Sequence, residues 1–265
     1  MLFRSGDPLL DAVILWTRIS PRMPAPVTVE VQWELSTSRE FATVTRMGSI
    51  STGPDRDYTV KVDVNGLQPG ATYFYRFRAL GFTSPVGRTK TAAAGAVARA
   101  KFAVVSCSNL AFGYFHVYRN LATRDDLDAV LHLGDYIYEY GNNEYGSLRP
   151  NVPSREVFTL ADYRARYARY RREPELQAIH AAHPFIAVWD DHEFANDAWQ
   201  NGAQNHMPAT EGDWAERRRA AARVYQEWMP IREQPGGQIY RKLAWGDLLD
   251  LVMLDTRVWG RDVQA

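Results

Sequence analysis

Four apolar stretches of the sequence each end at side chains of the kinds that bind metal ions. The groups that follow them directly are Ser106-Cys107, Gly134-Asp135, Asp190-Asp191-His192 and Asp255. Because ligands of open α/β sheets bind beyond the carboxyl ends of the strands, these groups converge if the stretches are neighbouring parallel strands. Carboxylates gathered in a low-dielectric crevice repel one another and are costly to bury unless a cation lies among them. The pattern therefore predicts a metal centre.

The residues around Asp135 and Asp191 indicate the chemistry of such a centre. Carboxylates, an imidazole and water around two metal ions activate a hydroxide for attack on phosphorus and neutralise the phosphoryl oxygens. Tyr138 lies three residues after Asp135, where a turn would return its phenol oxygen to the same ion. A phenolate ligand favours a hard, oxidised ion such as Fe(III). The segment WDDHE at 189–193 adds a second oxygen ligand and the imidazole of His192.

The first third of the chain has the pattern of a β-sandwich. Residues 11–95 alternate β-branched or aromatic residues with polar ones, and Gly- and Pro-containing turns separate the segments. The clearest predicted strands are 27–36, 58–64 and 72–80. The run NGLQPGATYFYRF is similar to the tyrosine corner of fibronectin type III domains, with Tyr73 as the corner residue. We therefore expect a small antiparallel, fibronectin-III-like sandwich.

The rest of the chain has the alternating pattern of an α/β domain. It follows a small-residue segment at 91–100 that fits a linker. The four apolar stretches are typical of strands buried on both faces of a parallel or mixed sheet. They span residues 101–106, 128–133, 184–189 and 248–254, and the clearest helical patterns between them cover 160–182 and 213–229. Strands and helices in turn predict an α/β architecture.

The composition is that of an ordinary globular protein. The 265 residues are 46% hydrophobic and 23% charged, outside the disordered and membrane classes. With 31 basic and 31 acidic residues the formal net charge is +0, so charge gives no reason to expect a nucleic-acid partner. The single cysteine excludes an intrachain disulfide. No apolar run reaches the length of a membrane span, and the first residues lack a signal-peptide core.

Several motifs, in chain order, closely resemble those of the PhoD-like alkaline phosphatase and phosphodiesterase family, which has the calcineurin-like metallophosphoesterase fold. The motifs are SGDPLLDAVILWTR at 5–18, GDYIYEY at 134–140, WDDHE at 189–193, ANDAW at 195–199 and LDTR at 254–257. The resemblance implies two domains. Residues 1–95 would form the family's N-terminal β-sandwich, and residues 96–265 the N-terminal portion of an α/β metallophosphoesterase domain.

The resemblance also implies roles for individual residues. Cys107, Asp135 and Tyr138 would surround an iron ion, with Asp135 bridging to a second metal site. Asp191 corresponds to the asparagine of the GNHE motif shared by this fold, and would bind the second ion, calcium in this family. His192 corresponds to the histidine of that motif, which supports the phosphate or the leaving group. The cofactors implied are therefore Fe(III) and Ca²⁺.

The activity implied is metal-dependent hydrolysis of phosphate esters, monoesters or diesters, by a metal-activated hydroxide. Asn196 would lie on the substrate side of the site, and the family is extracytoplasmic. Two other classes stay open. One is a catalytically inactive binding or interaction fragment of such a protein. The other is a metal-independent hydrolase in which Asp135 and Asp191 perform acid–base catalysis.

The family completes its two-metal centre with histidines beyond LDTR, typically in a GD.H motif, and no histidine follows His206 in this sequence. We therefore expect residues 1–265 to be the N-terminal part of a longer protein, with little hydrolytic activity by themselves. We also expect the inner face of the strands at 185–189 and 251–254 to lack its partner layer and to be exposed.

Other polar residues have simpler structural explanations. Five histidines lie in contexts without ligand spacing, and structural roles are expected for them: His116, His132, His180, His183 and His206. Tyr136 and Tyr140 are expected to be packing or surface aromatics, and Asp190 a supporting group or a helix cap. The arginine-rich segment 164–173 is expected to be a solvent-facing helix surface rather than a nucleic-acid site.

Overall fold

The computed structural model describes residues 1–22, 25 and 27–263. Its strands are β1 Leu2–Gly6, β2 Ala12–Arg18, β3 Val29–Ser36, β4 Val44–Thr52, β5 Thr59–Asn65, β6 Thr72–Ala79, β7 Phe82–Thr83, β8 Gly87–Lys90, β9 Phe102–Val105, β10 Ala129–His132, β11 Phe185–Ala187, β12 Arg241–Trp245 and β13 Leu249–Met253. Its α-helices are α1 His116–Ala122, α2 Leu160–Tyr170, α3 Pro174–Ala182, α4 Pro208–Glu211 and α5 Trp214–Trp228. None of these helices has the length and apolar character needed to cross a membrane.

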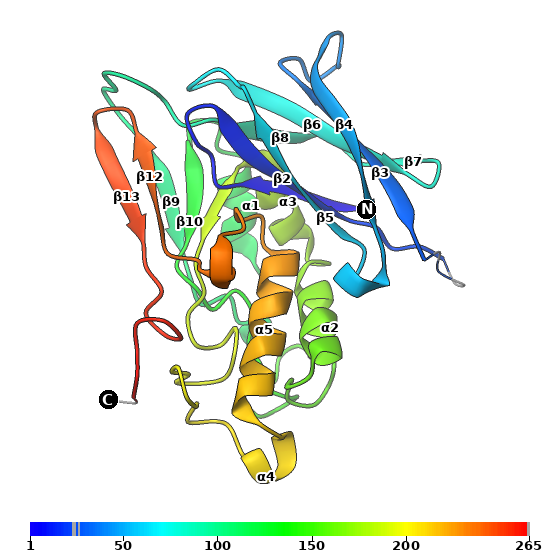
Figure 1. Cartoon of the computed structure of the whole chain (residues 1–265), viewed down its shortest axis with the longest axis vertical. Coiled ribbons are helices and arrows are strands. Elements are labelled where there is room, and N and C mark those ends of the chain that lie inside the picture. The colour runs from blue at the N-terminus through cyan, green and yellow to red at the C-terminus, as the bar shows by residue number, and fades with distance from the viewer. Residues whose placement is uncertain (23–24, 26, 264–265) are drawn as a thin grey trace.

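A six-stranded sheet joins the N-terminal strands to the α/β part of the chain (Figure 1). Its strand order is β5-β2-β1-β11-β10-β9, antiparallel from β5 to β1 and parallel from β1 to β9. Gly6 of β1 pairs with Phe185 of β11 at the junction. Segment 91–100 contains neither helix nor strand, as expected of a linker, yet Ala92 within it is fully buried. The two halves therefore share one sheet.

The predicted β-sandwich is confirmed. A second sheet of order β4-β3-β6-β7, with β8 also paired to β6, faces the β5-β2-β1 half of the large sheet. Their common core includes Leu15 of β2, Val31 of β3 and Phe77 of β6, all with no exposed surface. Tyr73 is buried, and its hydroxyl accepts a hydrogen bond from the backbone N–H of Gln68 at 2.9 Å, which is the expected tyrosine corner.

The predicted helical segment 160–182 is two helices. Thr159 and Asp162 form a capping box that starts α2, and the helix ends before Pro174, which occupies the first turn of α3. Proline lacks the N–H that a continuous helix requires and fits best at a helix start, so the chain turns there. Helix α2 packs beside α5, and α1 beside α3 (Figure 1).

The expectation that segment 164–173 faces solvent is wrong for half of its residues. Tyr163, Arg166, Tyr167 and Tyr170 recur at helical spacing and are fully buried. The guanidinium of Arg166 donates hydrogen bonds to the backbone carbonyls of Tyr138, Val152, Pro153 and Arg155. Because backbone carbonyls satisfy its donors, this arginine can be buried without a carboxylate partner. It ties helix α2 to two parts of the segment that connects β10 to α2.

The predicted strand at 248–254 is not part of the large sheet. Strand β13 pairs antiparallel with β12, and its residues alternate between more and less exposed positions instead of being buried on both faces. Asp250 interrupts the apolar run and lies on the exposed side. The hairpin packs on the large sheet through Trp245, whose ring meets Phe102 of β9 edge to face at 4.9 Å.

The expectation of an open inner face is wrong for the strand at 185–189 and correct for the hairpin. Phe185, Ile186 and Ala187 have no exposed surface. On β13 and the residue after it, Val252 and Leu254 are each 59% exposed. The helices and the β12–β13 hairpin therefore cover the centre of the large sheet, while the exposed side of the hairpin carries Val252 beside the ion pair of Lys242 with Asp250.

Candidate metal centre

Three of the four predicted ligand-bearing segments meet at one edge of the large sheet. Strands β9, β10 and β11 are parallel neighbours, and Cys107, Asp135 and Asp191 follow their carboxyl ends. The convergence expected from the sequence is confirmed for these strands. Asp255 follows β13 instead, and its carboxylate accepts hydrogen bonds from the backbone N–H groups of Arg257 and Val258 at 2.9 and 3.0 Å. It caps a turn.

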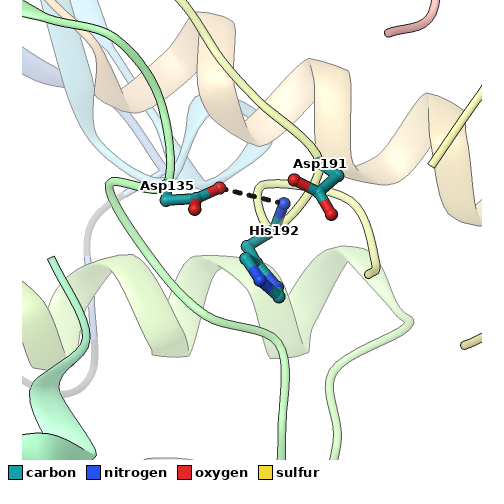
Figure 2. A group of neighbouring side chains, drawn as sticks. All are labelled: Asp135, Asp191 and His192. Carbon is teal, nitrogen blue, oxygen red and sulfur yellow. Dashed lines mark hydrogen bonds between the residues drawn. The ribbon is translucent and has the colours of Figure 1, made fainter. Parts of the chain in front are cut away.

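Asp135, Asp191 and His192 form a compact group. One potential ligand atom from each lies within 4.8 Å of the other two, and all three residues are buried. Figure 2 shows the two carboxylates pointing toward each other, with the backbone nitrogen of His192 between them, 3.4 Å from the carboxylate of Asp135. Two carboxylates that face one space suit a metal ion, and the imidazole of His192 lies beside them.

The electrostatics of this group also fit a bound cation. Burial raises the pKa of Asp135, and the negative Asp190 adds to the shift while His192 opposes it. Burial likewise raises the pKa of Asp191, and Asp135 adds to that shift while His192 opposes it. Carboxylates whose charge is disfavoured in this way are stabilised by a multivalent cation. The residues present therefore fit a metal ion.

Tyr138 and Cys107 lie against the same carboxylate. The Tyr138 hydroxyl donates a hydrogen bond to Asp135 at 3.1 Å, and its ring stacks on His192 with 4.1 Å between centroids. Cys107 is exposed, and its thiol interacts with both Asp135 and Tyr138. Partial desolvation raises the pKa of Cys107, and burial raises that of Tyr138. The sequence prediction that these two residues approach Asp135 is consistent with these contacts.

The backbone is strained at two of these positions. Cys107 has a φ of 56° and Asp135 a φ of 54°, both in the left-handed region that residues other than glycine rarely adopt. Gly134 precedes Asp135 with a φ of 106°, and a Cβ there would lie 2.4 Å from the backbone nitrogen of Asp190. Backbone strain of this kind is frequent at functional sites, where the surrounding contacts keep the residue in the unfavourable conformation.

His192 is held by a carboxylate that the sequence analysis did not assign. Nδ1 of His192 lies 2.8 Å from Oε2 of Glu139, which has no exposed surface. Burial lowers the pKa of His192, but the hydrogen bond and charge of Glu139 outweigh it and raise the pKa to about 9. The pair fixes the ring and leaves Nε2 available. Its place in the GDYIYEY motif is the sequence feature from which Glu139 could have been predicted as a site residue.

Glu193 is a second unassigned carboxylate, and it joins the ends of β10 and β11. It is 1% exposed and accepts backbone hydrogen bonds from Asp135 at 3.0 Å, Tyr136 at 2.6 Å and Asp190 at 2.8 Å. Burial, together with the charge of Asp135, raises its pKa to about 8. Glu193 is the last residue of the WDDHE motif, and that position could have indicated a role in the site.

Arg257 is a third unassigned residue and brings a positive charge to the carboxylates. Its guanidinium contacts Asp190 at 2.5 Å, Asp191 at 3.1 Å and Asp197 at 3.8 Å. Asp190 is thus a supporting ion-pair partner, one of the two roles expected for it. Its place in the LDTR motif is the sequence feature from which Arg257 could have been predicted as a site residue.

The side chain of Asn196 is turned to other partners. Its amide nitrogen donates to Gln204 at 2.5 Å, while its backbone N–H donates to Glu139 at 2.6 Å. Its substrate-side role therefore stays a prediction. Among the other histidines, His132 bonds Ser108 at 3.2 Å and His180 bonds Tyr136 at 2.8 Å, contacts that fit the structural roles expected of them.

Comparison with known proteins agrees with this architecture. Residues 102–265 match the family described as PhoD-like phosphatase, and residues 3–93 match PhoD-like phosphatase, N-terminal domain. Alkaline phosphatase D of Bacillus subtilis (strain 168) is 42% identical over 277 residues, which cover 98% of this chain and 47% of that protein. A solved structure titled "Structure of PhoD" matches with a TM-score of 0.90 at 39% identity, over 97% of this chain and 52% of that one.

The chain spans about half the length of these two relatives. Over that half the agreement is continuous, because both the sandwich and the α/β part are matched. With its sandwich, its shared sheet and its buried carboxylate–imidazole group, the chain belongs to the PhoD-like phosphatase family.

Proposed function

We propose that the protein is a metal-dependent phosphoric ester hydrolase of the alkaline phosphatase D type, acting on phosphate monoesters or diesters outside the cytoplasm. The observation that carries the proposal is the buried group of Asp135, Asp191 and His192 at the carboxyl edge of three parallel strands, in a chain of the PhoD-like phosphatase family. Because the chain spans about half of its relatives, the activity of the whole protein is part of the proposal.

In this proposal, Cys107, Asp135 and Tyr138 would hold Fe(III), and Asp135 and Asp191 would hold Ca²⁺ next to it. The ions, when bound, supply Lewis acidity that activates water and neutralises phosphoryl oxygens. Tyr138 and Asp135 are already in hydrogen-bond contact, which supports their assignment to one ion. The two carboxylates point at the same space, which supports a bridging role for Asp135.

His192 would act on the substrate directly. Glu139 holds the ring through Nδ1 and favours the imidazolium form, in which Nε2 also carries a proton and can donate it to the oxygen of the leaving group. Glu139 also holds the backbone of Asn196, the proposed substrate-side residue. A substitution of Glu139 would thus disturb both groups through one buried carboxylate.

Chelation tests this function. We expect the whole protein, loaded with iron and calcium, to hydrolyse bis(4-nitrophenyl) phosphate, to lose that activity after treatment with a chelator and to regain it with both ions. Residues 1–265 by themselves should show little hydrolysis. Hydrolysis that survives full metal removal would favour the metal-independent carboxylate mechanism. A protein that holds its metals and gives no hydrolysis above background would favour the inactive binding fragment.

Tyr138→Phe tests the iron assignment separately. A phenolate on Fe(III) produces a visible charge-transfer band, so we expect the iron-loaded protein to be coloured and Tyr138→Phe to lose the band while keeping its fold. Tyr140→Phe is the matched control, because Tyr140 lies two residues away and its ring neighbours Tyr145 and His192, at 5.1 and 5.7 Å between centroids, without a hydrogen bond to Asp135 among the described contacts. A colourless wild-type protein with full iron content would contradict the assignment of Tyr138.

A further inference from the structure

A cavity lies at the opposite end of the large sheet from the carboxylates of the candidate metal centre. Its volume is about 290 Å³, and its lining comes from β1, from the end of α2 and from α3. Strands β1 and β11 are parallel, and Gly6 of β1 pairs with Phe185, the first residue of β11. Arg4 precedes Gly6, whereas Asp191 and His192 follow the end of β11, so the two sites lie at opposite ends of these strands. No residue of the candidate metal centre lines the cavity.

Arg4 brings an unpaired positive charge to this cavity. It is 2% exposed, and its Nε and Nη1 are buried without a hydrogen-bond partner among the described residues. Its guanidinium lies over the ring of Trp16, the cross-strand neighbour, at 4.2 Å from the centroid. No carboxylate of the described residues forms an ion pair with this guanidinium, and burial lowers the pKa of Arg4 to about 10. A buried guanidinium normally donates hydrogen bonds to a carboxylate or to several backbone carbonyls, and Arg166 is an example of the second case.

Arg171 and His180 add two more unused donors. Nη1 of Arg171 lies 2.7 Å from Nε2 of His180, and the hydroxyl of Tyr136 lies 2.8 Å from the same nitrogen. Because a guanidinium only donates, Nε2 is the acceptor, so the proton of the neutral ring is on Nδ1. Both Nδ1 of His180 and Nε of Arg171 are buried without a partner among the described residues. Both residues line the cavity with Arg4.

The cavity therefore has donors and positive charge on one side and nothing to neutralise them. Its lining contains no aspartate or glutamate. A buried donor without an acceptor destabilises the fold, and an unpaired buried charge destabilises it more. An oxyanion bound beside Arg4, Arg171 and His180 would offer acceptors to these donors and a negative charge to the two guanidinium groups.

The rest of the lining indicates what the anion carries. Apart from Gln177 and the three donors, the lining side chains are apolar, and they include Phe3, Pro85 and Leu176. A bare inorganic ion would leave this surface in contact with water. We propose that the cavity is a binding site for a small organic anion, an oxyanion such as a carboxylate on a short apolar body, held by Arg4, Arg171 and His180. The site is independent of the proposed hydrolase function.

Thermal melts and titration calorimetry of the metal-free protein test the site with three probes at equal ionic strength: benzoate, inorganic phosphate and benzyl alcohol. We expect benzoate to raise the Tm of the wild-type chain by about 2–4 °C. Phosphate, which has the charge without the apolar body, should raise it less, and benzyl alcohol, which has the body without the charge, should leave it unchanged. The Asp135→Asn protein should respond like the wild type, which separates this site from the metal centre.

Two variants locate the binding. Without any anion, Arg4→Met should melt about 2–4 °C above the wild type, because it removes an unpaired buried charge, and benzoate should no longer raise its Tm. Ala178→Phe, at an exposed position of α3 that lines the cavity, should fill the apolar part and weaken benzoate binding at least tenfold without removing a charge. Arg39→Met, in an exposed turn, is the control for loss of a surface arginine.

The inference is overturned if benzoate stabilises Arg4→Met as much as the wild type, or if no anion stabilises the wild type. It is also overturned if Arg4→Met melts below the wild type without anion, because Arg4 would then be a stabilising structural residue. A response to phosphate that exceeds the response to benzoate would keep the oxyanion site but overturn the apolar body of the ligand.

Discussion

Asp135→Asn is expected to stabilise the metal-free protein and to destabilise the metal-loaded one. Without metal, burial and Asp190 raise the pKa of Asp135, so its negative charge opposes folding at neutral pH, and asparagine removes that charge. The variant should then melt about 2–4 °C above the wild type. With metal at 100 times the dissociation constant, the wild type gains about 2.7 kcal/mol, and most of this gain depends on the bridging carboxylate.

We expect Asp135→Asn to lower metal affinity more than about 100-fold, since substitutions that only support a ligand already cost 10–100-fold. Thermal melts of both proteins, with and without iron and calcium, would show the two curves exchange order. Asp125→Asn is the matched control, because Asp125 is exposed and precedes β10, at the opposite end of that strand from Asp135. Equal destabilisation in both conditions would mean that Asp135 is a structural cap and not a ligand.

Glu193→Ala is expected to cause the largest loss of stability. Glu193 is buried and accepts backbone hydrogen bonds from Asp135, Tyr136 and Asp190, so alanine would leave three buried N–H groups without an acceptor. Each such group costs about 1–3 kcal/mol, and we expect a total loss of about 3–5 kcal/mol in the free energy of unfolding. The Tm should fall by more than about 6 °C.

Glu193→Gln keeps the shape and one acceptor oxygen, and its loss should be less than half of that of Glu193→Ala. Glu30→Ala, at an exposed position of β3, should leave the melt unchanged. If Glu193→Ala melts like Glu30→Ala, the ends of β10 and β11 are held together by something other than this carboxylate. Since these ends carry Asp135 and Asp191, the variant should also bind metal more weakly.

The sequence predicted the parts of the fold that local pattern controls. The alternation in residues 72–80 predicted β6, and the run before Tyr73 predicted its tyrosine corner, because turn chemistry and strand period are local properties. Three parallel strands were predicted from continuous apolar runs. Burial on both faces is correct for β10 and β11 but wrong for β9, an edge strand in which Val104 is 60% exposed. Asp135 and Asp191 follow β10 and β11 in the sequence, and their proximity follows from the parallel pairing of these two strands.

The errors arose where burial depends on distant partners. Arg166 was expected on a solvent-facing surface, because its four carbonyl partners come from loops that the helical pattern does not reveal. Strand β13 was expected in the large sheet, but its partner β12 had no strong pattern of its own. Glu139, Glu193 and Arg257 were missed since each acts on a ligand through a contact at least 50 residues away in the sequence.

The central claim is that Asp135 and its neighbours hold a metal centre, and the most direct test is the position of iron in the protein. Crystals grown with Fe(III) and Ca²⁺ and measured at the iron absorption edge would give an anomalous difference map. We predict one strong peak within coordination distance of Asp135 and Tyr138, on the side that faces Asp191. Iron bound elsewhere, or an iron-containing crystal without a peak at this group, would contradict the account.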